Sequence, residues 1–151
     1  MAKKLRQYPT GEPIDEAFSK TLIVNQQTLL SESEQQTPQT YHMYFQQFRD
    51  SYQIRKWQTD SLYAKTLLYH HHLQNACRRR TFFVTENGYM GLGPYFARRD
   101  DVVVRFHGAG TPFIIRKKKD DRYKLVGEAY GHGMMEPEPC WSDSWELLSL
   151  V

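Results

Sequence analysis

Hydrophobic positions in the first half of the chain recur at spacings of three and four residues, the periodicity of an amphipathic helix. The pattern predicts helices over residues 14–24, about 38–54 and about 60–79. The faces expected to be buried are Ala17, Phe18, Thr21 and Leu22 in the first helix, Tyr41, Tyr44, Phe45 and Phe48 in the second, and Leu62, Tyr69, Leu73 and Ala76 in the third. Aromatic stripes of this kind pack in a core far more often than they bind a ligand.

From Arg80 the pattern changes to short alternating runs separated by turn residues, which is typical of β-strands. Asn87-Gly88 predicts a two-residue hairpin turn with positive φ at both positions. In the third strand Val102, Val104 and Phe106 are expected to face inward. The strands predicted by this pattern are residues 81–85, 89–92, 102–107, 112–116 and 123–132.

The sequence therefore predicts an α+β fold in which N-terminal helices pack on a small five-stranded antiparallel β-barrel. We expect an extended arm over residues 1–13, a helical region over 14–79, the barrel over 80–135 and a C-terminal tail over 136–151. All four are expected to form one structural unit, because a chain of 151 residues fits one domain and can bury a real core.

Composition excludes several classes of protein. Aromatic residues make up 14% of the chain, which argues against disorder. Two cysteines, Cys77 and Cys140, make no disulfide framework, and no apolar stretch resembles a signal peptide or a membrane span. We therefore expect an intracellular, cytoplasmic location and no membrane association.

The charge pattern disfavours nucleic-acid binding. The net charge is only +3, and the basic clusters 98–99 and 117–119 are each followed at once by an aspartate pair. A surface that binds the phosphate groups of a nucleic acid would not normally place carboxylates directly beside its basic residues.

Chemistry-bearing residues are present but not in a recognised catalytic or metal-binding spacing. His70, His71 and His72 are consecutive on a helix, so they point about 100° apart and cannot converge on one ion. Cys77 lies on the apolar side of its helix, where an inert thiol is expected, and Cys140 has no catalytic flanking motif. We predict no catalytic residue, no metal and no cofactor, and the sequence leans against an enzyme.

Two groups of residues are candidate binding sites. If the last strand is unbroken, Glu128, Tyr130 and His132 share one face, where they would bind a ligand or, alternatively, form a hydrogen-bonded row that orients neighbouring strands. Near the end of the sequence, Asp143 and Glu146 resemble a capping pair before an apolar run, and Trp141, Trp145 and Leu148 share one helical face. This segment either docks on a partner or closes the core as a helix or strand.

An ordered series of short strings resembles the C-terminal region of fungal heterokaryon-incompatibility proteins. The strings are AFSKTL (17–22), RTFFVT (80–85), GYMGLGP (88–94), DVV (101–103), PFIIR (112–116) and YKLVGEAYGHGMM (123–135). Nothing in the chain resembles the incompatibility domain of these proteins, which drives non-self recognition and programmed cell death.

The resemblance implies a non-enzymatic interaction or regulatory module that binds a protein partner or self-associates. The alternative is a small-ligand-binding or hydrolytic domain that uses the polar row on the last predicted strand.

Overall fold

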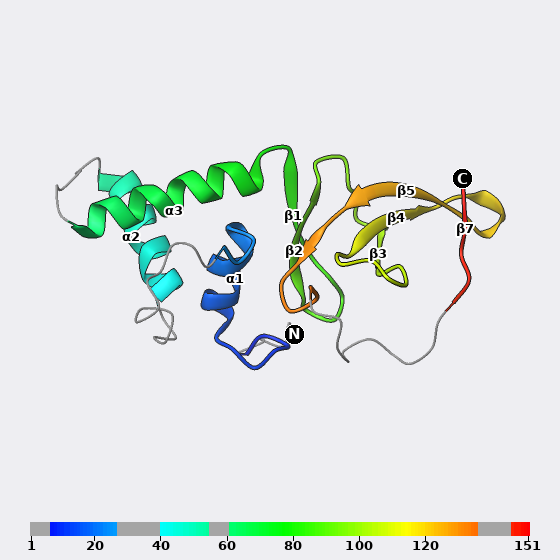
Figure 1. Ribbon diagram of the computed structural model, residues 1–151, viewed down its shortest axis with the longest axis horizontal. Helices are drawn as coiled ribbons and strands as arrows, with labels where there is room; N and C mark the ends of the chain where they lie inside the picture. The colour runs from blue at the N-terminus through cyan, green and yellow to red at the C-terminus, as the bar shows by residue number, and fades with distance from the viewer. Residues whose placement is uncertain (1–6, 27–39, 55–60, 136–145) are drawn as a thin grey trace. The chain divides into compact units, whose positions relative to one another are not determined.

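The computed structural model describes residues 7–26, 40–54, 61–135 and 146–151 (Figure 1). The chain divides into two compact units, Met1–Arg78 and Arg79–Val151, which we call the helical unit and the β unit. In the residues that the structure describes, the helical unit holds three helices and the β unit holds two sheets, so the predicted α+β class is confirmed. That the whole chain forms one structural unit stays a prediction.

The helical unit contains the three predicted helices, within a few residues of their expected bounds. They are α1 (Ile14–Leu22), α2 (Thr40–Ile54) and α3 (Ser61–Cys77). Helix α1 begins directly after Pro13 and carries Asp15 and Glu16 in its first turn and Lys20 in its last, a distribution that suits the helix dipole. In the described part of the chain, no helix combines the length and the apolar character needed to cross a membrane.

The core of the helical unit is largely aromatic. Ile23, Tyr44 and Tyr69 are fully buried together, and Phe45, Phe48 and Leu73 pack against them. The rings of Phe18 and Phe45 meet edge to face at 5.5 Å, an arrangement that aromatic pairs favour. The stripes on the second and third helices are therefore core, as expected; the side chains of Tyr41 and Leu62 lie outside the described residues.

The β unit contains two sheets instead of the predicted five-stranded barrel. The first has the order β1 (Arg80–Val84), β2 (Met90–Pro94), β6 (Tyr130–Gly131), all antiparallel. The second has the order β3 (Val102–Val104), β4 (Phe113–Lys117), β5 (Arg122–Glu128), β7 (Ser149–Leu150), and β7 runs parallel to β5. A short 3₁₀ turn, η2 (Lys119–Asp121), joins β4 to β5.

The barrel prediction is wrong for the described residues because the last predicted strand is broken and divided between the sheets. Gly127 takes a φ of 156°, and the ladder between β4 and β5 slips near Ile114/Ile115. Ala129 then donates its N–H to the carbonyl of Pro112 at 2.9 Å, and the chain continues as β6 in the other sheet. Strands β1 and β3 are left at the edges of their sheets, so no closed barrel forms in this part of the chain.

Two local predictions also need correction. The loop after β1 has three residues, since the N–H of Thr85 bonds the carbonyl of Tyr89, and only Gly88 takes a positive φ there. Such a loop is a normal alternative to the two-residue turn that Asn-Gly favours. In addition, β3 ends at Val104, and Val102 is 45% exposed instead of facing inward, because it lies on an edge strand.

Candidate functional site

A cleft of about 830 Å³ opens in the β unit beside β1 and β3. One wall is β1 with its turn, and the other is the segment that leads into β3. The lining consists of residues 81–87, 89, 97–103, 114 and 134. The cleft is therefore located where the two sheets fail to join into a barrel.

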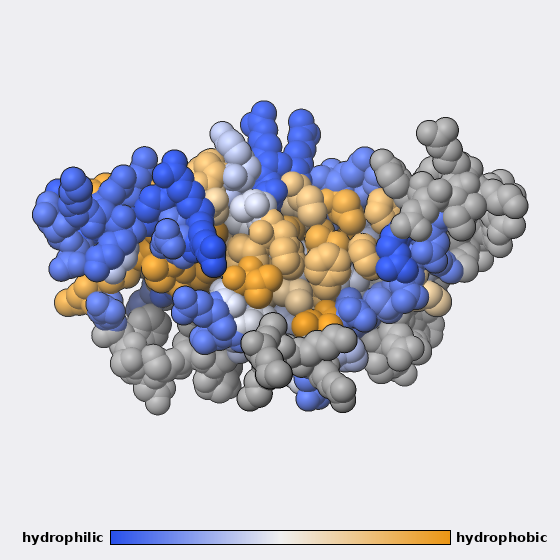
Figure 2. Space-filling view, turned by 180° about the vertical axis from the view of Figure 1, so that it is seen from behind, coloured by the Kyte–Doolittle hydropathy of each residue, from blue (hydrophilic) through white to orange (hydrophobic). Residues whose placement is uncertain are grey.

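The floor and the rim of the cleft differ in polarity. Ile114 and Met134 are nearly fully buried, whereas Val84 is 58% exposed. Arg98, Arg99 and Asp100 lie exposed along one side. Figure 2 shows that hydrophobic surface adjoins hydrophilic surface on the face seen from behind.

An arginine fork fixes the wall that precedes β3. Arg116 on β4 donates from Nε and Nη2 to the two carboxylate oxygens of Asp101, at 2.7 and 2.8 Å. The same Nη2 donates to the carbonyl of Phe96 at 3.0 Å, and Asp101 also accepts the N–H of Arg98 at 2.8 Å. Hydrogen bonds from Arg116 hold the pKa of Asp101 below its usual value. Two-point arginine–carboxylate contacts are geometrically specific, so this loop is pre-organised.

The loop presents two exposed aromatic side chains next to the cleft. Tyr95 is 68% exposed and Phe96 is 48% exposed, and their rings meet edge to face at 5.0 Å. Exposed aromatic residues on a rigid support are typical of interaction surfaces.

We expect Arg116→Lys to loosen this loop without unfolding the β unit. A lysine ammonium cannot make the two-point contact with Asp101, so the N–H of Arg98 loses its fixed acceptor. Hydrogen exchange at Arg98 should accelerate several-fold. Lys117→Ala is the control, because its ion pair with Asp121 is solvent-exposed and contributes little. Equal exchange at Arg98 in both variants would contradict the proposed fork.

The structure brings together two of the three residues of the predicted polar row. Tyr130 and His132 are buried, and Tyr130 Oη lies 2.9 Å from His132 Nδ1. Glu128 is exposed at the end of β5 and accepts a hydrogen bond from Thr111 Oγ1 at 3.0 Å. Because the strand is broken at Ala129, the single shared face does not form, and none of the three lines the cleft. A ligand-binding role for Glu128, Tyr130 and His132 stays a prediction.

The second predicted site is only partly described. Trp141, Trp145 and Cys140 lie outside the described residues. Leu148 is half-buried and directly precedes β7, and residues 146–148 are not helical, so Leu148 does not lie on a helix. A partner-docking role for Trp141, Trp145 and Leu148 stays a prediction.

In the helical unit, the surroundings of Cys77 and of the consecutive histidines favour structural roles for these side chains. Cys77 lies 3.6 Å from the carbonyl of Leu22, and burial raises the pKa of its thiol, which disfavours a reactive thiolate. The ring of His70 packs edge to face on Phe48 at 4.8 Å. Among the described residues, no three side chains of the metal-binding types converge.

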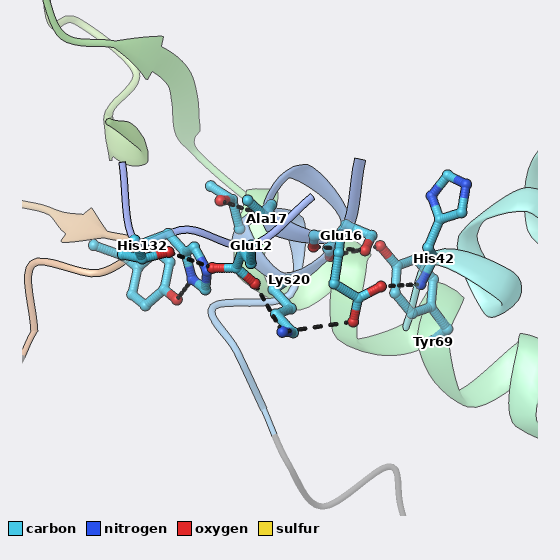
Figure 3. Close-up of polar contacts among 11 residues, drawn as sticks. Glu12, Glu16, Ala17, Lys20, His42, Tyr69 and His132 are labelled. Atoms are coloured by element: carbon cyan, nitrogen blue, oxygen red, sulfur yellow. Dashed lines mark hydrogen bonds and ion pairs between the residues drawn. The ribbon is translucent and has the colours of Figure 1, made fainter. Parts of the chain in front are cut away.

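A buried carboxylate that the sequence analysis missed organises the helical unit (Figure 3). Glu16 is 3% exposed and accepts the N–H of His42, in the first turn of α2, at 3.1 Å. Lys20 lies 3.6 Å from Glu16 and donates to Glu12 at 2.8 Å. A carboxylate at a helix N-terminus satisfies an N–H that has no partner within the helix. Glu16 therefore fixes the start of α2. This role depends on a contact between residues distant in the sequence, so the sequence alone does not indicate it.

Burial raises the pKa of Glu16, and Lys20 offsets part of the effect. Because the folded pKa is above the unfolded one, the folded state binds more protons between the two values, so stability falls as pH rises through this window. We expect the free energy of unfolding of the wild type, minus that of Glu16→Gln, to decrease as the pH rises above 4.5, the ordinary pKa of a glutamate side chain. Urea unfolding of both proteins across this range measures it. A difference that increases with pH would mean that Lys20 and the N–H of His42 outweigh burial.

Comparison with known proteins places the chain in a family. The profile of the Het-6 beta-barrel domain matches residues 17–146. Heterokaryon incompatibility protein 6, OR allele, of Neurospora crassa is 46% identical over 59 residues, which is 37% of this chain and 9% of that protein. No solved structure matches.

The resemblance to fungal heterokaryon-incompatibility proteins that the sequence strings indicated is thus confirmed. The matched part spans well over half of the chain, and it includes the larger part of α1, all of α2 and α3, both sheets up to β6 and every residue named above as lining the cleft. The chain belongs to the Het-6 beta-barrel domain family, which is found in fungal heterokaryon-incompatibility proteins.

Proposed function

We propose that this chain is a non-enzymatic interaction module that acts in fungal non-self recognition and binds a protein partner through the cleft beside β1 and β3. The observation that carries the proposal is the cleft itself, which lies between two strands at sheet edges. The biological context comes from a relative whose name refers to heterokaryon incompatibility and of which this chain matches a small part.

The composition of the cleft supports binding more than catalysis. Among the described residues that line the cleft there is no histidine, cysteine or serine, so these residues cannot assemble the Ser–His or Cys–His pair that many hydrolases use. The acidic side chain of Asp101 is held in the arginine fork, where it positions a loop.

The surroundings of the cleft support a macromolecular partner. Tyr95 and Phe96 are large, exposed and carried by a loop that Arg116 fastens. Side chains that are rigid before binding lose little conformational entropy when a partner covers them. The two aromatic side chains of this loop would therefore pack against a partner that also fills the cleft.

The test begins with cross-linking in fungal cells. A photoreactive amino acid replaces Val84, which lines the cleft, or Leu125, an exposed residue of β5 that does not. A protein cross-linked only from position 84 is then purified, and its affinity for the chain is measured by calorimetry.

The proposal predicts that Val84→Asp weakens this affinity about tenfold or more, whereas Leu125→Asp leaves it within about twofold. Both side chains are exposed on strands, so both variants should fold. Equal effects of the two substitutions, or no cross-link specific to position 84, would overturn the proposal.

A further inference from the structure

We propose that the occupant of the cleft is an extended peptide segment of the protein partner, which pairs with β3 as an added strand. This inference rests on the proposed function and states how the partner is held. It is carried by the backbone of β3, by the alternation that the cleft imposes on side chains, and by the charges at its rim.

The backbone of β3 has hydrogen-bonding capacity on the side away from β4. Val102, Val103 and Val104 oppose Ile115, Ile114 and Phe113 in an antiparallel register. Alternate residues of such a strand direct their N–H and C=O to opposite sides, so at least one residue of β3 directs both groups away from β4. Among the described residues, β4 is the only strand that pairs with β3.

Strand β3 forms part of the wall of the cleft. Val102 and Val103 both belong to its lining, and β1, the facing wall, is the edge strand of the other sheet. A strand edge presents a template for pairing with another chain. An extended peptide can enter the cleft and form hydrogen bonds with these backbone groups. A compact folded surface cannot enter the cleft to reach them.

The depth of the cleft predicts the side-chain pattern of the peptide. Phe83, Ile114 and Met134 form apolar lining, and the latter two are almost fully buried. Successive residues of a strand point to opposite faces, so every second residue of the peptide would face this floor. We therefore infer a segment in which apolar residues alternate with polar ones.

The charges at the rim favour a peptide over a polyanion. Arg98 and Arg99 lie on the same lining as Glu86 and Asp100, and the charge of Asp101 is compensated by Arg116. The two signs therefore balance, and a nucleic acid would meet as many carboxylates as guanidinium groups. A peptide that carries both an acidic and a basic residue beside its apolar positions complements this rim.

The experiment uses the full chain and defined peptides. A displayed library of peptides of about ten residues is selected against the chain, with Val84→Asp as the counter-selection. The best binder is synthesised in two forms, one N-methylated at its odd positions and one at its even positions. N-methylation removes backbone donors on one side of a strand and leaves the protein unaltered.

We expect one methylated form to lose affinity about tenfold or more and the other to stay within about threefold. Hydrogen exchange of at least one β3 amide should also slow when the unmodified peptide binds. Equal effects of the two forms would overturn strand addition and leave the proposed cleft function standing. If no peptide depends on Val84, both proposals fail. A concentration-dependent dimer that competes with the peptide would assign the cleft to a second copy of the chain and overturn this inference.

Discussion

Gly91→Ala is expected to be among the most damaging single substitutions in the β unit. Gly91 lies on β2, opposite Phe83 of β1 and Gly131 of β6. A Cβ at this position would overlap the ring of Phe83 and the carbonyl oxygen of Tyr130. The carbonyl belongs to the backbone of β6, so it cannot turn away as a flexible side chain does. Overpacking of this kind costs about 1–3 kcal/mol and occasionally more.

The same substitution at Gly110 is the matched control. Gly110 has open space around its Cβ position, and its φ is not positive, so alanine fits there. Urea unfolding followed by circular dichroism should show a much lower midpoint for Gly91→Ala and a midpoint near that of the wild type for Gly110→Ala. Similar midpoints for the two variants would contradict the close approach of β1, β2 and β6 at Gly91.

Tyr69→Ala is expected to destabilise the helical unit by about 3–5 kcal/mol. Tyr69 is fully buried between Ile23 and Tyr44, and its hydroxyl donates to the carbonyl of Ser19 at 2.8 Å. Burial raises the pKa of this hydroxyl well above its ordinary value, so it remains a donor at any physiological pH. Removing the ring leaves a cavity and a buried carbonyl without its donor.

Tyr69→Phe separates the two contributions. It keeps the ring and removes the donor to Ser19, which should cost about 1–3 kcal/mol. Leu68→Ala is the control on the same helix, because Leu68 is 41% exposed and its loss should cost little. If Tyr69→Phe is as stable as the wild type, the hydrogen bond to Ser19 contributes nothing to folding.

The three helices and the strands β1 to β5 were predictable because their information is local. The spacing of Tyr44, Phe45 and Phe48 is visible in the sequence, and these side chains do form core. The short apolar runs that form β1 to β5 are equally visible, although β3 is shorter than predicted. The turn after β1 was less predictable, since Asn-Gly is compatible with loops of two or three residues.

The two-sheet arrangement was not predictable because contacts distant in sequence create it. In the run from Tyr123 to His132, Gly127 is compatible with a bulge but does not specify one. The break depends on the bond from Ala129 to Pro112 and on the register of β4. The β7 strand pairs with β5 through only two residues, too few for a periodic signal.

The candidate site was hidden for the same reason. In the sequence, Asp100-Asp101 after two arginines indicates a charge-balanced surface. Arg116, the partner of Asp101 on β4, lies 15 residues further along the chain. The cleft lies beside β1 and β3, which are the edge strands of two separate sheets. Tyr130 and His132 are in hydrogen-bonding contact and Glu128 accepts a hydrogen bond from Thr111 instead; a ligand-binding role for the three stays a prediction.

The pairing of β2 with β6 has a consequence for the order of folding. The hairpins β1–β2 and β4–β5 join neighbouring segments, so each can form within microseconds of collapse. Gly91 meets Gly131 only after all the intervening chain has been closed into a loop, which costs entropy before any contact offsets it. The β2–β6 ladder should therefore form late in the folding of the β unit, and until then the edge of β2 that β6 will cover remains open to pairing with other chains.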